Sequence, residues 1–239
     1  MKLRTSAATA LAATAAVLAM GAAPAMAAGH TTAALAKPSL TLSASTTWAT
    51  YGHWVTLTAH LGKTAANHTV EIDGADWGGG SWVLKKANVD RNGNLVAYAK
   101  MGHNTTFTAK FAGDSKDAAT STKKVVYSAA VVNAAMVGQA YNSGGYAVYH
   151  AGQNPTIKGT VSPNKTGEAI WITVQAYYSG SWHTVSLQHQ YFNLGAGSSF
   201  DVYLTGVPAG AVIREAMTFR GDGWNTGSGT TWHYAKVVK

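Results

Sequence analysis

The sequence predicts an all-β protein in which two antiparallel β-sandwiches follow one another along the chain. Apolar residues alternate with polar ones from Pro38 onward, and turn signals recur at intervals of roughly ten residues. This alternation directs one set of side chains to each face of a strand, as in a sandwich that buries one face of each sheet. The same order of strands and turns then occurs a second time, which indicates a duplicated domain.

The composition favours an extracellular β-protein. Charged residues make up 12% of the 239 residues, which is about half of the usual ~25%. Tryptophan, tyrosine and branched aliphatic residues are plentiful and periodic, so the chain is not intrinsically disordered. The sequence has no cysteine, which excludes disulfides, thiolate nucleophiles and cysteine-bound zinc or iron–sulfur sites.

The first 27 residues have the features of a signal peptide. Lys2 and Arg4 precede an apolar stretch over residues 7–23, and residues 25–27 (Ala-Met-Ala) offer small residues for cleavage. The stretch is alanine-rich and only weakly hydrophobic, which favours a cleaved signal over a membrane anchor. We therefore predict cleavage after residue 27, a secreted protein, and no stable membrane insertion afterwards. Cleavage lowers the formal net charge from +8 to +6, and this positive charge favours acidic partners.

A flexible leader is expected over residues 28–37, followed by a first domain over residues 38–128. Its turn at residues 90–94 (Asp-Arg-Asn-Gly-Asn) contains Asn-Gly, which readily adopts the positive φ angles of a tight hairpin. The expected strands, each an alternating run between turn signals, are residues 39–47, 53–61, 69–73, 81–87, 95–100, 105–112 and 123–128.

The second domain is expected over residues 129–239. Residues 169–178 show the clearest alternation, with Ile170, Ile172 and Val174 directed inward. The expected strands are residues 134–141, 156–161, 169–178, 182–192, 199–204, 211–220 and 231–238.

Short motifs recur at equivalent places in the two domains. Residues 111–114 (Phe-Ala-Gly-Asp) correspond to residues 219–222 (Phe-Arg-Gly-Asp), and residues 80–82 correspond to residues 180–182, both Gly-Ser-Trp. The second copy contains Arg-Gly-Asp, an integrin-recognition tripeptide. Its place in the repeat indicates a turn of the fold instead.

Residues 40–61 and 105–122 resemble the bacterial immunoglobulin-like repeat family of secreted and surface proteins. In that family, a strand ending in aromatic-x-Gly-Asp leads into a short loop and the last strand, as at residues 111–114. The first domain matches over most of its length, and the second mainly over residues 169–185 and 219–231. The resemblance implies two tandem immunoglobulin-like sandwiches that serve as a spacer, adhesin or binding module, and it implies no particular ligand. The leader and composition also resemble secreted proteins of high-GC Gram-positive bacteria.

No residue pattern predicts catalysis, so we expect no enzyme, no catalytic residue, no metal and no cofactor. None of the nine histidines lies beside a G-x-S-x-G motif. Asp73, Asp76 and Asp90 each lie at a turn signal, which explains them without paired-carboxylate chemistry. The alternating oxygens of residues 90–94 leave a weak calcium site open. The sequence shows no nucleic-acid-binding motif.

Glu215 is a local anomaly in the expected strand 211–220. If Met217 and Phe219 point inward, Glu215 does so as well, and a buried carboxylate needs a partner or a raised pKa. We favour the simpler interpretation that the strand begins later or bulges at this position.

The aromatic residues supply the functional prediction. The chain has eight tryptophans and eleven tyrosines, and several lie near loops or on polar strand faces. They are Trp48, Trp54, Trp77, Trp82, Tyr177, Tyr178, Trp182, Tyr191, Trp224 and Trp232. Exposed rings of this kind can stack on sugars or anchor a protein partner. Alternatively, they cover the sandwich ends, pack between the domains or pair across strands.

We select six of these residues as candidate ligand-binding residues: Trp77, Trp82, Tyr178, Trp182, Trp224 and Trp232. The sequence thus predicts a secreted, non-catalytic binding or adhesion protein. Its expected ligand is a cell-wall polymer, another extracellular polysaccharide or a protein. The alternative is a spacer or adaptor subunit of an extracellular complex.

Overall fold

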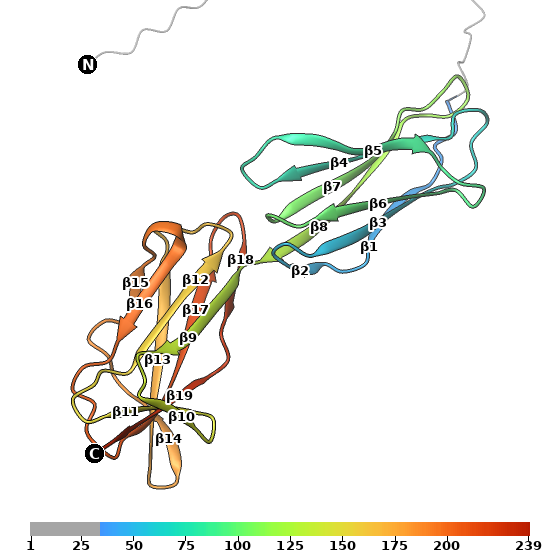
Figure 1. Cartoon of the computed structure of the whole chain (residues 1–239). Coiled ribbons are helices and arrows are strands. Elements are labelled where there is room, and N and C mark those ends of the chain that lie inside the picture. Colours follow the sequence, from blue (N-terminus) through green and yellow to red (C-terminus); the bar gives the residue numbers. More distant parts are fainter. Residues whose placement is uncertain (1–33) are drawn as a thin grey trace, which may run out of the picture. The chain divides into compact units, whose positions relative to one another are not determined.

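The computed structural model describes residues 34–239, so the predicted signal peptide and most of the leader lie outside the described residues. Residues 35–239 form one compact unit. Apart from a short 3-10 helix, η1 (Ala196–Ser198), its regular elements are β-strands (Figure 1). Between residues 34 and 239, no helix is long and apolar enough to cross a membrane.

The first half of this unit is a sandwich of two sheets. One sheet has the order β1-β3-β6, and the other has the order β8-β7-β4-β5. The short β2 joins the second sheet, where it pairs in parallel with β8. The strands are β1 (Leu40–Ala44), β2 (Trp48–Thr50), β3 (Trp54–Leu61), β4 (Thr69–Asp76), β5 (Ser81–Asn88), β6 (Asn94–Lys100), β7 (Thr105–Phe111) and β8 (Thr120–Ala129).

Alternating side chains of both sheets fill the core of this sandwich. Val55 and Leu57 on β3 face Ile72 on β4 and Phe107 on β7, and all four are buried in one cluster. Fully burying a side chain of this size stabilises the fold by about 1.5–3 kcal/mol. The period-two pattern of the sequence therefore specifies which face of each strand turns inward.

The second half is another sandwich. A sheet of order β9-β12-β16 packs against a larger sheet in which β13, β17 and β19 are neighbours. The strands are β9 (Val131–Val137), β10 (Tyr141–Ser143), β11 (Tyr146–His150), β12 (Thr156–Ser162), β13 (Ala169–Tyr178), β14 (Ser181–Thr184), β15 (Tyr191–Asn193), β16 (Ser199–Tyr203), β17 (Val212–Gly221), β18 (Thr226–Gly229) and β19 (His233–Val238). The parallel pair of β11 and β19 repeats that of β2 and β8.

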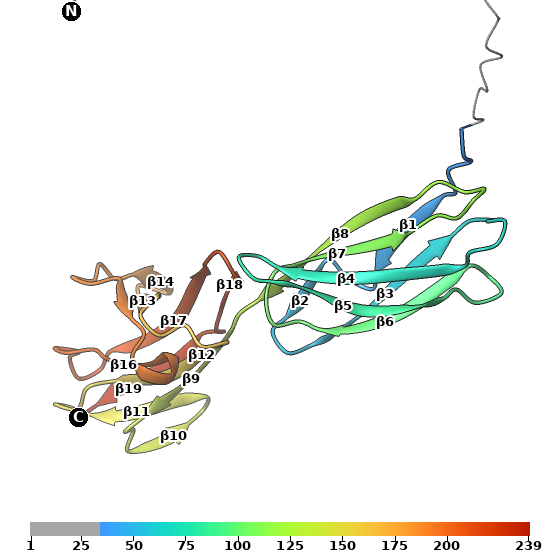
Figure 2. The same ribbon diagram turned by 90° about the horizontal axis from the view of Figure 1, so that it is seen from above.

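Both sandwiches have the strand order of an immunoglobulin-like fold. Strands corresponding to A, B and E form one sheet, and those corresponding to C, F and G form the other. In the first sandwich these are β1, β3 and β6 against β4, β7 and β8; in the second they are β9, β12 and β16 against β13, β17 and β19 (Figure 2). The predicted all-β fold class is confirmed.

Some predicted elements differ from the structure. The expected strand 182–192 is two short strands, β14 and β15, because the chain leaves the sheet after Thr184 and packs Leu187 against the second core. The expected strand 134–141 begins earlier, as β9, and ends at Val137. The end of the expected leader contacts the first sandwich, where Ala36 forms a parallel bridge with Asp117.

The preferred interpretation of Glu215 was wrong. Strand β17 begins at Val212, and its register with β13 runs without a shift from Ile213 to Phe219. Glu215 therefore points inward and is fully buried. Within residues 34–239, neither of its carboxylate oxygens has a hydrogen-bond partner, and burial raises its pKa to about 8.

Candidate binding face of the second sandwich

The outer face of the sheet containing β13, β17 and β19 gathers large aromatic and cationic side chains. Because Ile213 and Glu215 are buried, Arg214 between them points outward. The register places Gln175 on β13 and Tyr234 on β19 on either side of Arg214. Side chains from three adjacent strands therefore meet on this face.

Seven side chains form one connected cluster here, which branches at Trp182 and which we call the aromatic ladder: Tyr177, Trp182, Arg214, Trp232, Tyr234, Tyr146 and Lys236. The Arg214 guanidinium carbon lies 4.5 Å from the ring centroid of Trp182 and 4.3 Å from that of Trp232. Trp182 also contacts Tyr177, with ring centroids 5.2 Å apart, and Tyr234, at 5.8 Å.

The ladder continues to β11, which lies between β19 and the short edge strand β10. The Tyr234 ring contacts Tyr146 of β11 at 5.6 Å between centroids, and the Lys236 ammonium lies 4.2 Å from the Tyr146 ring. A cation over an aromatic face is attracted by about 0.5–1 kcal/mol at an exposed site and more where water is excluded. These contacts hold the rings in place on the outer face.

Hydrogen bonds fix Arg214 within the ladder. Its Nε and Nη2 donate to Gln175 Oε1 at 2.8 and 2.5 Å. The flat guanidinium thereby stays between the two indole rings, an arrangement that a lysine could not reproduce.

A second aromatic and cationic pair lies on the same face. The Arg220 guanidinium carbon lies 3.3 Å from the ring centroid of Trp171, and Trp171 contacts Tyr191 of β15 at 5.0 Å. The Tyr191 side chain is 54% exposed. Cations and rings therefore occur at both ends of β17 on its outer side.

This face carries no carboxylate among the described residues. The second sandwich has four acidic residues. Glu168 lies in the loop before β13, and Asp201 lies on β16 of the other sheet, paired with Lys158 at 2.6 Å. Glu215 points into the core, and Asp222 is bonded to Lys165. The outer face is therefore positive as well as aromatic.

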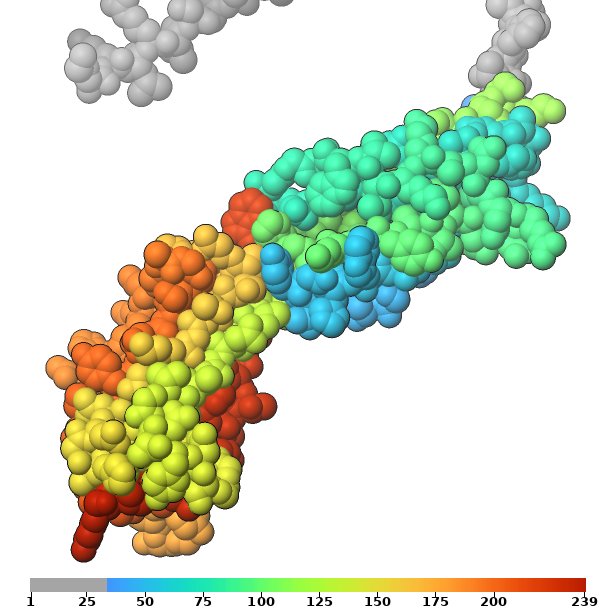
Figure 3. Space-filling model, in the orientation of Figure 1, coloured from blue at the N-terminus to red at the C-terminus, as the bar shows by residue number. Residues whose placement is uncertain are grey.

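The structure brings together two of the six predicted binding residues. Trp182 and Trp232 flank Arg214 in the ladder. Tyr178 lies beside it in the β13–β14 hairpin, whose turn stands at the surface (light orange in Figure 3). Tyr178 is 56% exposed and stacks on His183 at 3.9 Å, on the opposite side of the hairpin from Tyr177.

The other three predicted residues lie elsewhere. Trp82 on β5 covers Gly74 of β4, where an added Cβ would come within 2.5 Å of the indole. Trp77 packs edge-on against Tyr127 at 5.7 Å, and Trp224 packs against His103 at 5.0 Å. Trp224, a residue of the second sandwich, therefore packs against the first, and packing between the domains is one of the alternatives that the sequence left open.

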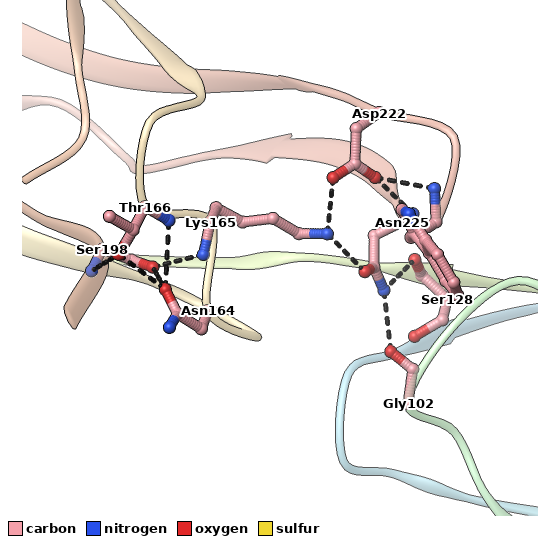
Figure 4. Close-up of polar contacts among 9 residues, drawn as sticks. Gly102, Ser128, Asn164, Lys165, Thr166, Ser198, Asp222 and Asn225 are labelled. Atoms are coloured by element: carbon pink, nitrogen blue, oxygen red, sulfur yellow. Dashed lines mark hydrogen bonds and ion pairs between the residues drawn. The ribbon is translucent and has the colours of Figure 1, made fainter. Parts of the chain in front are cut away.

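Asp222, the last residue of the Arg-Gly-Asp sequence, belongs to a buried polar network (Figure 4). Lys165 Nζ donates to Asp222 Oδ2 at 2.6 Å and to Asn225 Oδ1 at 2.8 Å. Burial opposes ionisation of Asp222, but hydrogen bonds from Lys165, Asn225 and Trp224 outweigh it and lower the pKa of its carboxyl. This carboxylate serves the fold, as its place in the repeat predicted.

The network also joins the two sandwiches. Asn225 Nδ2 donates to the backbone oxygens of Gly102 and Ser128 at 2.9 and 3.2 Å. The backbone N–H of Asn104 donates to the Trp224 oxygen at 2.7 Å. The turn between β17 and β18 is therefore bonded directly to the first sandwich.

Solved structures similar to this chain include the following two. One is described as the BSP domain of a biofilm-associated protein, with 16% identity over 84% of this chain and a TM-score of 0.26. This chain spans 29% of that one. The other is a marsupial T cell receptor, with 11% identity, a TM-score of 0.31, and coverage of 84% of this chain and 72% of the other. No family model and no curated protein matches the sequence.

The side chains of the candidate face can form non-covalent contacts with another molecule. Its groups are aromatic rings, two guanidinium groups, an ammonium group and an amide, which can stack, donate hydrogen bonds and attract anions. Within residues 34–239, no cluster of three or more histidine and carboxylate side chains could hold a metal ion. The contacts among these groups fix their positions on the outer face of the sheet.

Proposed function

We propose that this is a secreted, non-catalytic binding protein whose second sandwich binds an extracellular polysaccharide or protein. The observation that carries the proposal is the aromatic ladder on the outer face of β13, β14, β17 and β19. Tryptophan, tyrosine and arginine are the residues that most often dominate the energy of a protein interface.

The ladder is suited to binding because its parts are already ordered. Arg214 occupies ring faces of both Trp182 and Trp232, so these tryptophans offer their remaining surfaces and edges. Tyr177 is 47% exposed and extends the ladder toward the hairpin. A ligand that meets rings held in place loses less conformational entropy on binding.

A pulldown tests this function. The secreted chain would be incubated with insoluble chitin, cellulose and peptidoglycan, and with culture-medium proteins. Trp182→Ala and Trp232→Ala are expected to weaken binding by roughly tenfold or more, as loss of a central aromatic contact does. Trp54→Ala is the matched control, because Trp54 is 67% exposed and lies on β3 of the first sandwich.

Binding that survives both ladder substitutions, in variants whose circular dichroism is unchanged, would contradict the role of this face. Failure of the secreted chain to retain any of these materials would contradict the function itself.

The second candidate function is a spacer or adaptor in an extracellular complex. This candidate is favoured by the hydrogen bonds that join the two sandwiches through Trp224 and Asn225. A spacer needs domains that are joined to one another in this way. Gel filtration of the protein from culture medium tests this candidate. An adaptor co-elutes with a partner, whereas a lone monomer argues against it.

A further inference from the structure

We infer that the ligand of the aromatic face is an acidic polysaccharide, a sugar polymer that carries carboxylate groups along its length. This inference rests on the proposed function and specifies its ligand class. Its basis is the charge of the outer face of β13, β17 and β19, which has Arg214, Arg220 and Lys236 and no carboxylate.

The cations of this face are not neutralised by acidic side chains. Arg220 and Lys236 lie over the rings of Trp171 and Tyr146. A ring quadrupole attracts a cation without cancelling its charge. Both cations therefore remain able to pair with an anion on a ligand.

The first sandwich shows the contrast. On the outer face of its larger sheet, Lys86 pairs with Glu71 at 2.8 Å and Lys110 pairs with Asp73. Those lysines already have carboxylate partners within the protein. Other lysines of the first sandwich, such as Lys123 and Lys124 on β8, form no ion pair in the described part of the chain. Within residues 34–239, however, every cation that lies over an aromatic ring belongs to the second sandwich.

The spacing of the cations favours a polymer over a small anion. Arg220 and Arg214 lie six residues apart on one side of β17, and Lys236 is level with Val212 two residues beyond Arg214. At about 3.3 Å per strand residue, the three positions cover roughly 26 Å of the sheet. A single small anion can contact one of these cations, whereas an extended chain can contact all three.

The rings between the cations suit the sugar part of such a chain. Trp182, Trp232 and Tyr177 lie beside Arg214, and Trp171 and Tyr191 lie beside Arg220. Apolar C–H groups of a sugar can pack on an aromatic ring while its carboxylate pairs with the neighbouring cation. An acidic polysaccharide uses both features of the face.

A pair of matched polymers tests the inference. Polygalacturonate carries one carboxylate per sugar, and its carboxyl-reduced derivative has the same backbone without charge. Affinities of the secreted chain for both would be measured by calorimetry at low salt. We expect the acidic polymer to bind at least about tenfold more tightly, and its affinity to fall as salt screens exposed charges.

Matched variants locate the site. Arg220→Gln combined with Lys236→Gln is expected to lower the affinity for the acidic polymer about tenfold, because two cations are lost from the face. Lys123→Gln plus Lys124→Gln removes the same charge from β8 of the first sandwich and is expected to change the affinity less than about twofold. Unchanged circular dichroism and melting confirm that each variant is folded.

The outcomes distinguish failure of the acidic-ligand inference from failure of the proposed function. Equal affinity for the two polymers, or binding of neutral glycans alone, overturns the acidic ligand and leaves the proposed function standing. Equal loss in the two double variants overturns the assignment to this face, because net charge alone then explains binding. No binding to any polymer or protein overturns both the inference and the proposed function.

Discussion

At the scale of single residues, Glu215 is the clearest departure from what composition and pattern suggest. Its side chain is fully buried, and neither carboxylate oxygen has a hydrogen-bond partner within residues 34–239. Burial without a compensating cation favours the neutral carboxylic acid, which is why its pKa rises to about 8. At neutral pH, the folded protein therefore keeps a proton on Glu215 that the unfolded chain, with a pKa of 4.5, has already lost.

The raised pKa predicts a pH-dependent stability. Between the unfolded value of 4.5 and about 8, the native state binds one more proton than the unfolded state, so stability falls as pH rises. Burial lowers the pKa of the neighbouring His233 below its unfolded value of 6.5. Below pH 6.5 this histidine therefore makes stability rise with pH, opposite to the effect of Glu215. The window from pH 6.5 to 8 therefore isolates Glu215, with an expected slope of up to about 1.4 kcal/mol per pH unit.

Glu215→Gln removes this titration while keeping the shape of the side chain. We expect the variant to lose the slope in urea unfolding curves recorded between pH 6.5 and 8, relative to the parent. Glu168→Gln, at an exposed position, is expected to keep it. If the free energy of unfolding fell equally with pH in the parent and in Glu215→Gln, Glu215 would not titrate in the core as described.

At the scale of elements, the repeated Gly-Asp motif is a turn that both sandwiches build in the same way. Asp114 accepts hydrogen bonds from the backbone N–H groups of Lys116 and Asp117. Asp222 accepts the equivalent bonds from Trp224 and Asn225. The glycine before each aspartate has a positive φ, +81° at Gly113 and +92° at Gly221.

This turn predicts a strong preference for glycine. Gly221→Ala forces an L side chain into a left-handed conformation and brings its Cβ to 2.7 Å from the backbone N of Gly227. We expect a loss of stability of at least about 1–2 kcal/mol. Gly223→Ala, in the same turn but with open space around its Cβ and no positive φ, is the control and is expected to change stability little.

Thermal unfolding of the two variants provides the measurement. Equal melting temperatures for Gly221→Ala and Gly223→Ala would contradict the turn geometry.

Elements with long periodic runs could be predicted from the sequence, and the short ones could not. The runs around β3, β13 and β17 alternate over seven or more residues, so the burial of their apolar side chains can be read directly. The buried Glu215 of β17 is the exception. Strands β2 and β10 have three residues each, too few for a period. They exist because a longer strand lies beside them, and that pairing is a property of the fold.

Individual residues of the candidate site could be predicted from the sequence, but their proximity to one another could not. Trp182 and Trp232 were identified as aromatic residues with a possible binding role. Arg214 was missed, although alternation within β17 places it outward. What brings the three together is the adjacency of β14, β13, β17 and β19, which depends on sheet order.

At the scale of the whole molecule, the buried network around Lys165 connects the sandwiches. The Lys165 side chain is 5% exposed and that of Asp222 is 13% exposed. Lys165→Met leaves the Asp222 carboxylate without its ammonium partner in a water-poor site. Breaking one side of a buried ion pair is costly, and we expect a loss of about 2–4 kcal/mol.

Lys158→Met is the matched control for that prediction. It breaks the Lys158–Asp201 pair, in which both side chains are more than half exposed, and should cost at most about 1 kcal/mol. Urea unfolding followed by tryptophan fluorescence measures both variants. Similar losses for the two would show that the Lys165 network does not contribute as a buried pair.

The aromatic ladder, finally, leads us to propose that the second sandwich is the part of the molecule that binds a ligand. Nuclear magnetic resonance of the eight indole N–H groups, during titration with polygalacturonate, tests this most directly. We expect progressive, saturable shifts for Trp182 and Trp232, with Trp54 and Trp82 of the first sandwich unchanged. Shifts confined to Trp54 and Trp82, or no saturable shift of any indole, would contradict it.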